Sequence, residues 1–370
     1  MLCSLGLFFA KLQQNLYIIL SRFHNFAFRL IILVSMEYNI DLKPYNTFGL
    51  NCKAKEFLRL RTEEDLDLLQ SEYGKQTILF LGFGANVVFV DNEFGGLVAK
   101  LENKGINVKE EDKNFCFVEV EAGQTWDDFV DWTCERGLSG VENLAGIPSS
   151  VGAAPVQNIG AYGMEVKDSI TYVVVFDLKE NKFITLKNEE CRFAYRNSIF
   201  KYQKGNLLIW KVGFCLSKNF TPNINYKALE EKIKKENIVS LTPKLIAQKV
   251  REIRNEKLPN FKVLGNVGSF FKNPVIEKHQ YELLKKDYKD IVAFDSGEKK
   301  KISAAWLIEQ CGYKGKRIGN IGMHDRQALV MVNYGGASGE DVLHLAHQIQ
   351  KNVKEKFNID LNIEAHIIKQ

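Results

Sequence analysis

Three polar residues in this 370-residue chain are candidates for catalysis: Arg196, Ser269 and Glu364. Arg196 follows Tyr195 in a half-apolar segment, where its guanidinium could present fixed donors to a carboxylate or a developing enolate. Ser269 lies in a segment rich in glycine and lysine, and its hydroxyl could give a proton to a strongly basic carbanion. Taken singly, each also suits a structural position: a surface arginine, a turn serine, and a glutamate on the solvent side of a final strand over 361–368.

A glycine-rich segment at residues 79–90, LFLGFGANVVFV, joins two apolar strands. A dinucleotide-binding fingerprint requires a third glycine and a helix after the first strand, and this segment has neither, which disfavours a Rossmann site. Gly82 and Gly84 can adopt positive φ and turn successive N–H groups toward one anion. A simple tight hairpin is the alternative.

A second segment, ENLAGIPSSVGAAPVQNIGAYG at residues 142–163, carries no charge after Glu142 and is rich in Gly, Ala and Ser. Such a loop lets the backbone pack closely against a large flat ligand, although a packed turn region would have the same composition. Its pairing with the first glycine-rich segment favours a ligand site.

Several other classes of site are disfavoured. The six histidines form no HExxH or Ser/His/Asp arrangement, and His344 and His347 suit a solvent-facing helix better than a metal site. The seven cysteines are scattered without a CxxC pair, so neither zinc nor a disulfide framework is expected, and a reducing compartment fits best. A formal charge of +5, from 50 cations and 45 anions, is too small to indicate a nucleic-acid partner.

Alternating strands and helices must position these candidates. Apolar periodicity and punctuation by glycine and proline predict strands at 57–60, 77–81, 87–90, 115–123, 171–178, 182–186, 206–216 and 361–368. The same signals predict helices at 62–72, 126–136 and 303–311, and a last helix containing residues 342–353. Residues 218–260 turn lysine-rich and helical, with three prolines, and mark the best domain boundary.

Residues 1–35 differ from the rest of the chain because they contain no Asp or Glu. Their uncharged runs are well short of the roughly 20 residues that a spanning helix needs, and no cleavage site follows them. Met36 begins a polar, well-patterned stretch, so we expect the first 35 residues to be an over-called start. A signal anchor, an amphipathic surface helix or a transit-like peptide are the alternatives.

Six motifs, taken in order and spacing, resemble the UDP-N-acetylenolpyruvoylglucosamine reductase (MurB) family of flavoenzymes. They are NTFG at 46–49, GFGAN at 82–86, IPSSVGAAPVQNIGAYG at 147–163, YRNS at 195–198, GNVGSFFKNP at 265–274 and IEAHI at 363–367. The resemblance runs from about Asn39 to Ile368, and the ordered set is far more specific than any single motif.

The resemblance implies an α+β fold. An FAD-binding domain of the vanillyl-alcohol-oxidase (PCMH) type would occupy residues 36–220, with two α+β lobes at about 50–104 and 105–220. An α+β substrate-binding domain would occupy residues 221–370, and its last strand would return to the active site.

The resemblance also implies a reaction in two halves. NADPH reduces non-covalently bound FAD, and the flavin then gives hydride to the enolpyruvyl methylene carbon of the UDP-sugar. Protonation of the adjoining carbon yields UDP-N-acetylmuramate for peptidoglycan synthesis. In this scheme Ser269 is the proton donor, while Arg196 and Glu364 polarise the substrate carboxylate and stabilise its enolic form. The enzyme is expected to be a cytoplasmic monomer without a metal, a nucleic-acid partner or stable membrane association.

Binding residues are assigned by the same resemblance. Those expected near FAD are Gly82, Gly84, Ala85, Asn86, Ile147, Pro148, Gly152, Ala153, Ala154 and Gly160. Those expected at the substrate are Tyr226 and Lys257, which would contact its diphosphate, with Arg254, Asn273 and Gln327. The region of Tyr226 points to the longer subtype of the family, in which a tyrosine loop closes over substrate.

The chain departs from the family pattern at three places. At Gly152, Ala153 and Ala154 it lacks the serine hydroxyls that face the FAD pyrophosphate in some members, so only backbone donors are expected there. YRNS in place of YRDS leaves Arg196 without an adjacent acid. The leader at residues 1–35 has no counterpart in the family, which favours the over-called start.

Two other functions are alternatives to this reductase activity. An oxidase of the same fold acting on a small alcohol would typically anchor FAD covalently through His or Cys. No histidine lies between His24 and His279, although Cys116 and Cys134 are not excluded as anchors. A membrane-attached flavin-binding protein without activity would not need the three candidate catalytic residues together.

Overall fold

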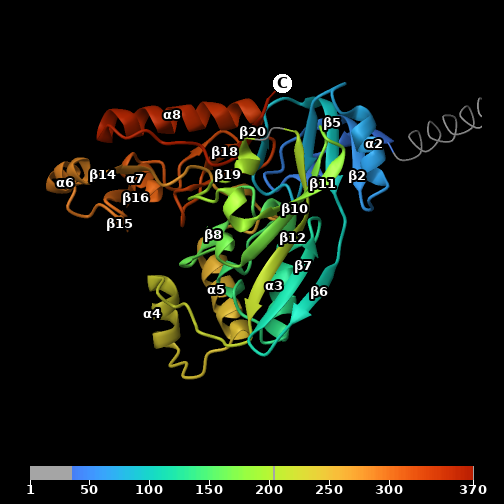
Figure 1. The fold of residues 1–370 in the computed structure, drawn as a ribbon. Coiled ribbons are helices and arrows are strands. Elements are labelled where there is room, and N and C mark those ends of the chain that lie inside the picture. The colour runs from blue at the N-terminus through green and yellow to red at the C-terminus, as the bar shows by residue number, and fades with distance from the viewer. Residues whose placement is uncertain (1–35, 203–204, 370) are drawn as a thin grey trace, which may run out of the picture.

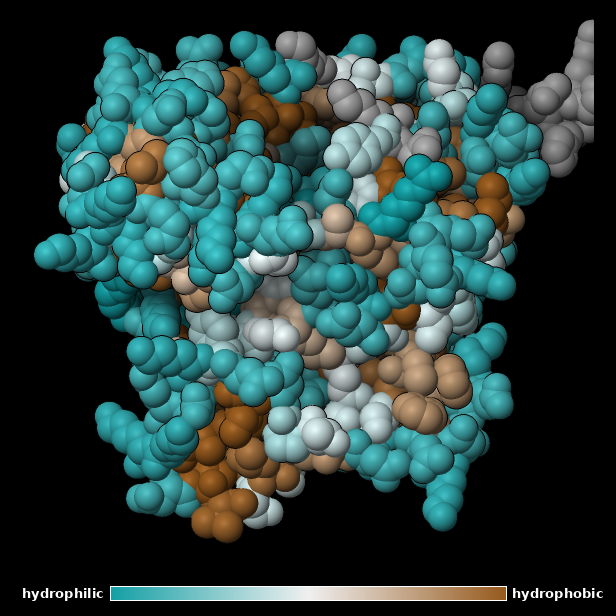
Figure 2. Space-filling model, turned by 60° about the vertical axis from the view of Figure 1, so that its left-hand side comes forward, coloured by the Kyte–Doolittle hydropathy of each residue, from teal (hydrophilic) through white to brown (hydrophobic). Residues whose placement is uncertain are grey.

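The computed structural model describes residues 36–202 and 205–369. The expectations for residues 1–35 lie outside this range. Within it, no helix is both long enough and apolar enough to cross a membrane. Hydrophilic side chains cover most of the face shown in Figure 2, while pale and apolar residues occupy the recess between its upper and lower parts.

The first sheet has four strands in the order β1-β2-β5-β3, with β1 antiparallel and the other pairs parallel. Its strands are β1 (Met36–Asp41), β2 (Lys53–Leu60), β3 (Ile78–Leu81) and β5 (Glu93–Leu101). Helix α2 (Asp65–Glu72) lies beside β2 in the upper right of Figure 1 and buries three leucines, Leu66, Leu68 and Leu69. Buried positions alternate along β3, whereas β2 lies inside the sheet and buries both Phe57 and Leu58.

The second sheet is antiparallel throughout, in the order β11-β10-β12-β7-β6. Its strands are β6 (Ile106–Glu111), β7 (Phe115–Glu121), β10 (Ile170–Asp177), β11 (Lys182–Lys187) and β12 (Leu207–Ser217). Helix α3 (Trp126–Glu135) covers one face, where Trp126 and Phe129 pack against Phe214 of β12. Helices α4 (Lys227–Lys235) and α5 (Pro243–Lys257) contribute buried residues to the same core.

The C-terminal part of the chain forms a separate core around two further sheets. One has the order β13-β19-β18-β17 and the other β14-β16-β15. The strands are β13 (Gly265–Ser269), β14 (Val275–Glu277), β15 (Ala293–Ser296), β16 (Lys299–Ile302), β17 (Arg317–Ile318), β18 (Ile321–Met323) and β19 (Val330–Asn333). The helices are α6 (Lys278–Asp287), α7 (Ala304–Gln310) and α8 (Gly339–Phe357), of which α8 crosses the upper left of Figure 1.

The chain end returns to the first lobe. Strand β20 (His366–Ile368) pairs in parallel with β4 (Val87–Phe89), so the C-terminus lies at the top of Figure 1 beside residues from the beginning of the fold. A short hairpin of β8 (Gly160–Ala161) and β9 (Met164–Glu165) completes the strands.

Most predicted elements are confirmed, although several of their ends differ; the strand predicted at 57–60, for example, begins at Lys53. The predicted helix from Thr62 begins at Asp65, because the Asp65 carboxylate accepts hydrogen bonds from the N–H groups of Arg61 and Thr62 and holds them outside the helix. The predicted strand over 361–368 is regular only from His366. The division of the chain at residue 220 stays a prediction.

Candidate active site

A cavity of about 1660 Å³ opens where the first sheet, the second sheet and the C-terminal part meet. Its lining runs from Thr47 to Lys369 and so draws on almost the whole described chain. A single drug-sized ligand typically occupies roughly 300–1,000 Å³. The cavity therefore has room for a large cofactor together with part of a substrate.

Cations outnumber acids in the lining of this cavity. Seven Lys and Arg side chains contribute to it, against two acids. The cations are Arg196, Lys201, Arg251, Arg254, Lys272, Arg326 and Lys369, and the acids are Asp127 and Glu364. Such an excess, concentrated in a concave surface, favours anionic ligands such as nucleotides.

The loop of Gly82 to Asn86 leads from β3 to β4 along the cavity wall. The tight-hairpin alternative is wrong, because β3 pairs with β5 and β4 pairs with β20. Of the two glycines, only Gly84 has positive φ, +82°. A Cβ on Gly84 would overlap the carbonyl of Tyr45, and the Gly84 carbonyl accepts a hydrogen bond from the Thr47 N–H at 3.0 Å. Close backbone packing against residues 45–47 thus requires glycine here.

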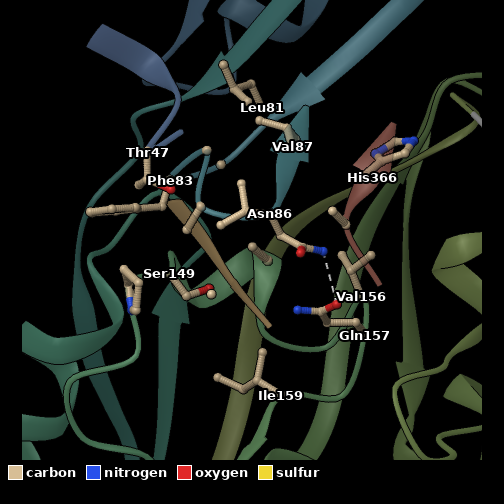
Figure 3. Close-up of a pocket in the computed structure, with 18 of the residues that line it drawn as sticks. Thr47, Leu81, Phe83, Asn86, Val87, Ser149, Val156, Gln157, Ile159 and His366 are labelled. Carbon is tan, nitrogen blue, oxygen red and sulfur yellow. Dashed lines mark hydrogen bonds between the residues drawn. The ribbon is translucent and has the colours of Figure 1, made fainter. Parts of the chain in front are cut away.

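Asn86 links this loop to two other walls of the cavity. Its Nδ2 donates to Gln157 Oε1 at 3.1 Å, the dashed line in Figure 3, and to the carbonyl of Glu364 at 3.3 Å. Figure 3 also shows Phe83 beside Thr47, and His366 of β20 across from them. Asn86 therefore fixes the uncharged loop and the chain end relative to the first lobe.

The uncharged loop contributes Ile147, Pro148, Gly152, Ala153 and Gly160 to the cavity, together with Ser149 and Gln157. Ala154 is fully buried and is not part of the lining. The expectation of free backbone donors at residues 152–154 is wrong. Their N–H groups donate to the carbonyls of Ala122, Ser150 and Val151 within the protein.

Arg196 lies in a tight turn between the second sheet and the cavity. Ala194 and Asn197 exchange two backbone hydrogen bonds of 3.0 Å, and Arg196 itself has φ +53°. Its Nε donates to Glu364 Oε1 at 2.9 Å and its Nη2 to the carbonyl of Gly160 at 2.7 Å. Glu364 therefore supplies the acid that the sequence YRNS lacks next to Arg196.

Glu364 is held by a short antiparallel contact between residues 362–364 and residues 270–272. Glu364 N–H donates to the Phe270 carbonyl at 2.8 Å, and Lys272 N–H donates to the Asn362 carbonyl at 2.8 Å. The solvent-side position expected from strand alternation is wrong, because the chain is irregular here and only 9% of the Glu364 side chain is exposed. Burial raises the pKa of the Glu364 carboxyl, and the neighbouring cations Arg196 and Lys201 partly oppose this.

Ser269 ends β13, one residue before the segment that pairs with 362–364. The register shifts between Asn266 and Ser269, where Gly268 has φ +70°. Ser269 lines the cavity and is exposed there. The hydroxyl is thus available to a ligand in the same cavity as the Arg196–Glu364 pair.

Only one of the five expected substrate residues lines the cavity. Arg254 lines the cavity, with its Nε donating to the Gly146 carbonyl at 3.1 Å. The other four lie outside the lining. Tyr226 is 41% exposed and packs edge-on against Tyr162, while Asn273 accepts a hydrogen bond from the Ala304 N–H. The remaining two are Lys257 and Gln327.

Sequence reasoning missed Lys201, which lines the cavity near Glu364. Its positive charge in the segment FAYRNSIFK was the available signal. Lys272, one of the lysines expected to assist Ser269, lines the cavity as well. Sequence reasoning also missed the role of Thr47, whose hydroxyl donates to the Asn266 carbonyl at 2.6 Å and so joins the NTFG motif to β13.

Comparison with known proteins identifies the family. Residues 56–186 match a family model described as an FAD binding domain, and residues 259–368 match the C-terminal domain of UDP-N-acetylenolpyruvoylglucosamine reductase. A UDP-N-acetylenolpyruvoylglucosamine reductase of Neisseria gonorrhoeae is 44% identical over 336 residues, which cover 90% of this chain and 97% of the relative. The chain belongs to the UDP-N-acetylenolpyruvoylglucosamine reductase family.

Two further comparisons give the same family. The enzyme of Bdellovibrio bacteriovorus is 42% identical over 334 residues, covering 90% of this chain and 99% of the relative. The crystal structure of the Thermus caldophilus reductase superposes with a TM-score of 0.64 at 24% identity, over 90% of this chain and all of that one. The α+β fold of this reductase is confirmed, and FAD is its cofactor.

The residues present fit FAD. Gly82 lines the cavity, and a Cβ on it would lie 2.5 Å from the buried hydroxyl of Ser150 behind it. Glycine therefore allows the backbone of this wall to pack closely and leaves no side chain between it and a ligand. The cation excess and the size of the cavity suit a dinucleotide as well.

Proposed function

We propose that Arg196, Glu364 and Ser269 carry the chemistry of this member of the reductase family, the reduction of the enolpyruvyl ether of UDP-N-acetylglucosamine to UDP-N-acetylmuramate. The observation that carries the proposal is the Arg196–Glu364 pair, 2.9 Å from Nε to Oε1, in the cavity that Ser269 also lines. When bound, FAD supplies the hydride that NADPH provides.

Arg196 and Glu364 act on the carboxylate of the enolpyruvyl group. Adding hydride to the methylene carbon places negative charge on the adjoining carbon, and conjugation spreads it onto that carboxylate. A fixed guanidinium stabilises this charge most as it develops. Glu364 holds the guanidinium by its Nε and the Gly160 carbonyl holds Nη2, so in this proposal Nη1 is the group that meets the substrate carboxylate.

Ser269 gives its hydroxyl proton to the carbon beside the carboxylate. A serine is a weak acid, so the step requires a basic carbanion and a hydroxyl within hydrogen-bond reach of it. The exposure of Ser269 in the lining of the cavity supports this assignment.

The diphosphate end of the substrate would meet Arg254, which lines the cavity, and Tyr226 and Lys257, which stand outside it on the helical segment of α4 and α5. Asn273 and Gln327 remain proposed substrate residues on the strength of the family resemblance.

The small-alcohol oxidase is the weaker alternative. Covalent attachment of FAD would need a nucleophilic side chain against the cavity. Cys116 and Cys134 are buried elsewhere in the core, and His366 is the one histidine in the lining among the described residues. The pKa of the Cys134 thiol is raised to about 11 by burial, which disfavours a thiolate nucleophile there.

We further propose that the substrate-binding part begins near Pro259 instead of at residue 221, the boundary expected from the sequence. Helices α4 and α5 share the core of the second sheet, and the match to the C-terminal reductase domain begins at residue 259. A cytoplasmic monomer remains our expectation for the assembled enzyme.

Half-reactions of the purified full chain test the proposal. The protein should be yellow, and addition of the enolpyruvyl UDP-sugar should reoxidise the flavin after NADPH has reduced it. In Ser269→Ala, reduction by NADPH should stay near normal, while reoxidation should slow by roughly 10²–10⁴-fold, the range for a general acid.

The matched control is Ser296→Ala, an exposed serine at the end of β15. Its two half-reactions should equal those of the wild type. A colourless protein, or NADPH oxidation indifferent to the sugar, would contradict the function. Equal slowing of both halves in Ser269→Ala would remove Ser269 from the acid role.

A further inference from the structure

The turn that carries Arg196 is conformationally strained. Arg196 occupies the third position of the four-residue turn from Ala194 to Asn197, with φ +53°, where glycine or asparagine is normally favoured. A bulky residue in the left-handed region costs roughly 1–3 kcal/mol and persists only where its surroundings fix it. Something must therefore hold the backbone of Arg196.

A hydrogen bond from Lys201 holds the backbone carbonyl of Arg196. Lys201 ends the short 3-10 helix η6 (Ile199–Lys201), and its Nζ donates to the Arg196 carbonyl at 2.9 Å. The preceding Ser198 hydroxyl donates to the Val156 carbonyl at 2.5 Å, which fixes the start of this helix against the uncharged loop. The side chain of Lys201 thus reaches back to the strained residue Arg196 and fixes its backbone.

Lys201 forms no ion pair with a carboxylate of the described residues. Its Nζ donates a hydrogen bond to a carbonyl, and the residue lines the cavity together with Lys272. The charged groups that act on it are Lys272, Arg196 and Glu364. Burial lowers the pKa of the Lys201 ammonium to about 8, and Lys272 adds to this.

We propose that Lys201 is a positioning residue for the reduction: its ammonium holds the Arg196 carbonyl, which keeps the guanidinium aimed at the substrate carboxylate, and its charge favours the ionised form of Glu364. This inference rests on the proposed roles of Arg196 and Glu364. It adds a residue that acts through both, by a hydrogen bond to the Arg196 carbonyl and by its charge near Glu364.

The alternative is that Lys201 only stabilises the fold. A structural role would lower the melting temperature or the FAD content and would affect both half-reactions together. A positioning role affects the half-reaction that uses the substrate carboxylate, since reduction of FAD by NADPH involves no such group.

The test compares two variants. Lys201→Met keeps the length of the side chain and removes its hydrogen-bond donor and its charge, whereas Lys201→Arg keeps the donor and the charge. In holoenzyme of the Met variant, reoxidation by the enolpyruvyl UDP-sugar should slow about 100-fold, the cost of an ångström-scale misplacement of a catalytic group. Reduction by saturating NADPH should remain near the wild-type rate, and the Arg variant should recover most of the loss. Melting temperature and flavin absorbance are measured on the same samples.

Lys356→Met is the matched control, because Lys356 also donates to a backbone carbonyl, that of Gln310 at 2.6 Å, on the exposed end of α8. Both of its half-reactions should equal the wild type. Wild-type reoxidation should fall as pH rises through about 8, where Lys201 loses its proton, and in Lys201→Arg this fall should move to higher pH.

Three outcomes would overturn the proposal: a Met variant that reoxidises at the wild-type rate, equal slowing of both half-reactions, or an alkaline limb unchanged in the Arg variant. Failure of the proposed function would look different. In that case the sugar would not reoxidise the wild-type flavin at all.

Discussion

At the scale of single residues, the site depends on a carboxylate that burial and cations affect in opposite directions. Glu364 is removed from water, which raises its pKa, while Arg196, Lys201 and Lys272 favour its ionised form. The Arg196–Glu364 hydrogen bond is charge-assisted only when Glu364 is ionised. The reaction should therefore depend on the protonation state of this one side chain.

The pH dependence of substrate reduction follows from this. The activity that needs ionised Glu364 is present above the folded pKa and is lost as pH falls through it. Since burial raises that pKa, the loss should begin at a higher pH than for an exposed glutamate. The measurement is the rate of flavin reoxidation by the enolpyruvyl UDP-sugar as a function of pH.

Glu364→Gln provides the corresponding variant. It keeps a hydrogen-bonding group beside Arg196 and removes the charge, so reoxidation should slow by roughly 10²–10³-fold, the range for losing one stabiliser of developing charge. The acid limb should vanish from the remaining activity. Glu298→Gln, at an exposed glutamate between β15 and β16, is the control. An acid limb that persists in Glu364→Gln would assign it to another group.

At the scale of elements, the loop between β3 and β4 is the part of the FAD site that should tolerate substitution least. A side chain on Gly84 would be strained by its φ of +82° and would also overlap the Tyr45 carbonyl. Gly137 shares a positive φ, +68°, but a Cβ there would meet nothing within 4 Å, and it lies outside the cavity lining. The two glycines separate backbone strain from close packing.

Gly84→Ala should therefore destabilise the protein by clearly more than the roughly 1 kcal/mol expected for Ala at a positive-φ position, and purified protein should contain less FAD. Gly137→Ala should show only the smaller loss and should bind FAD normally. Chemical denaturation and the flavin-to-protein absorbance ratio measure the two effects. Equal destabilisation by both substitutions would mean that the loop can move away from Tyr45.

The elements also show what could be predicted from the sequence. Period-2 alternation gave the position of β7, because that strand buries every second residue, whereas β10 and β12 were found from their apolar runs, since they bury consecutive residues as well. The contact between Arg196 and Glu364 joins residues 168 positions apart, and no local period encodes it. Its components were found because the motifs resemble a family, whereas Lys201 was missed because its partner is a backbone carbonyl, which leaves no trace in residue type.

The irregular segment before β20 illustrates the same limit. The alternation from Leu361 to Ile367 predicts a regular strand with Glu364 on its solvent side. Hydrogen bonds from the Glu364 N–H to Phe270 and from the Lys272 N–H to Asn362 override that pattern, since they come from a partner distant in sequence. Tertiary pairing decided the orientation of the catalytic glutamate.

At the scale of the whole molecule, charge is concentrated where the parts meet. The chain as a whole has 50 cations and 45 anions, yet the cavity lining has seven cations and two acids. Each part alone presents only some of these groups, so the anion-binding surface exists only when the parts are assembled. Contacts that join the parts should therefore affect cofactor retention as well as stability.

Strand β20 is the contact that tests this most directly. Its adjacent residues pack into different cores: Ile368 belongs to that of the first sheet, and Ile367 packs against that of the C-terminal part. The backbone of β20 is held by β4, with the Val90 N–H donating to the Ile368 carbonyl at 2.9 Å and the His366 N–H to the Asn86 carbonyl at 2.8 Å. The same three-residue strand follows Glu364 by two positions.

Ile368→Ala should lower the free energy of unfolding by about 2–5 kcal/mol, the usual cost of truncating a buried isoleucine. It should also slow reoxidation by the enolpyruvyl UDP-sugar, because β20 fixes the segment that presents Glu364 to Arg196. Ile318→Ala, on the edge strand β17 where the side chain is 36% exposed, is the matched control and should change stability by less than about 1 kcal/mol. Denaturant titration and the two half-reaction rates are measured on each variant. If Ile368→Ala is destabilised yet reoxidises at the wild-type rate, β20 joins the cores without positioning Glu364.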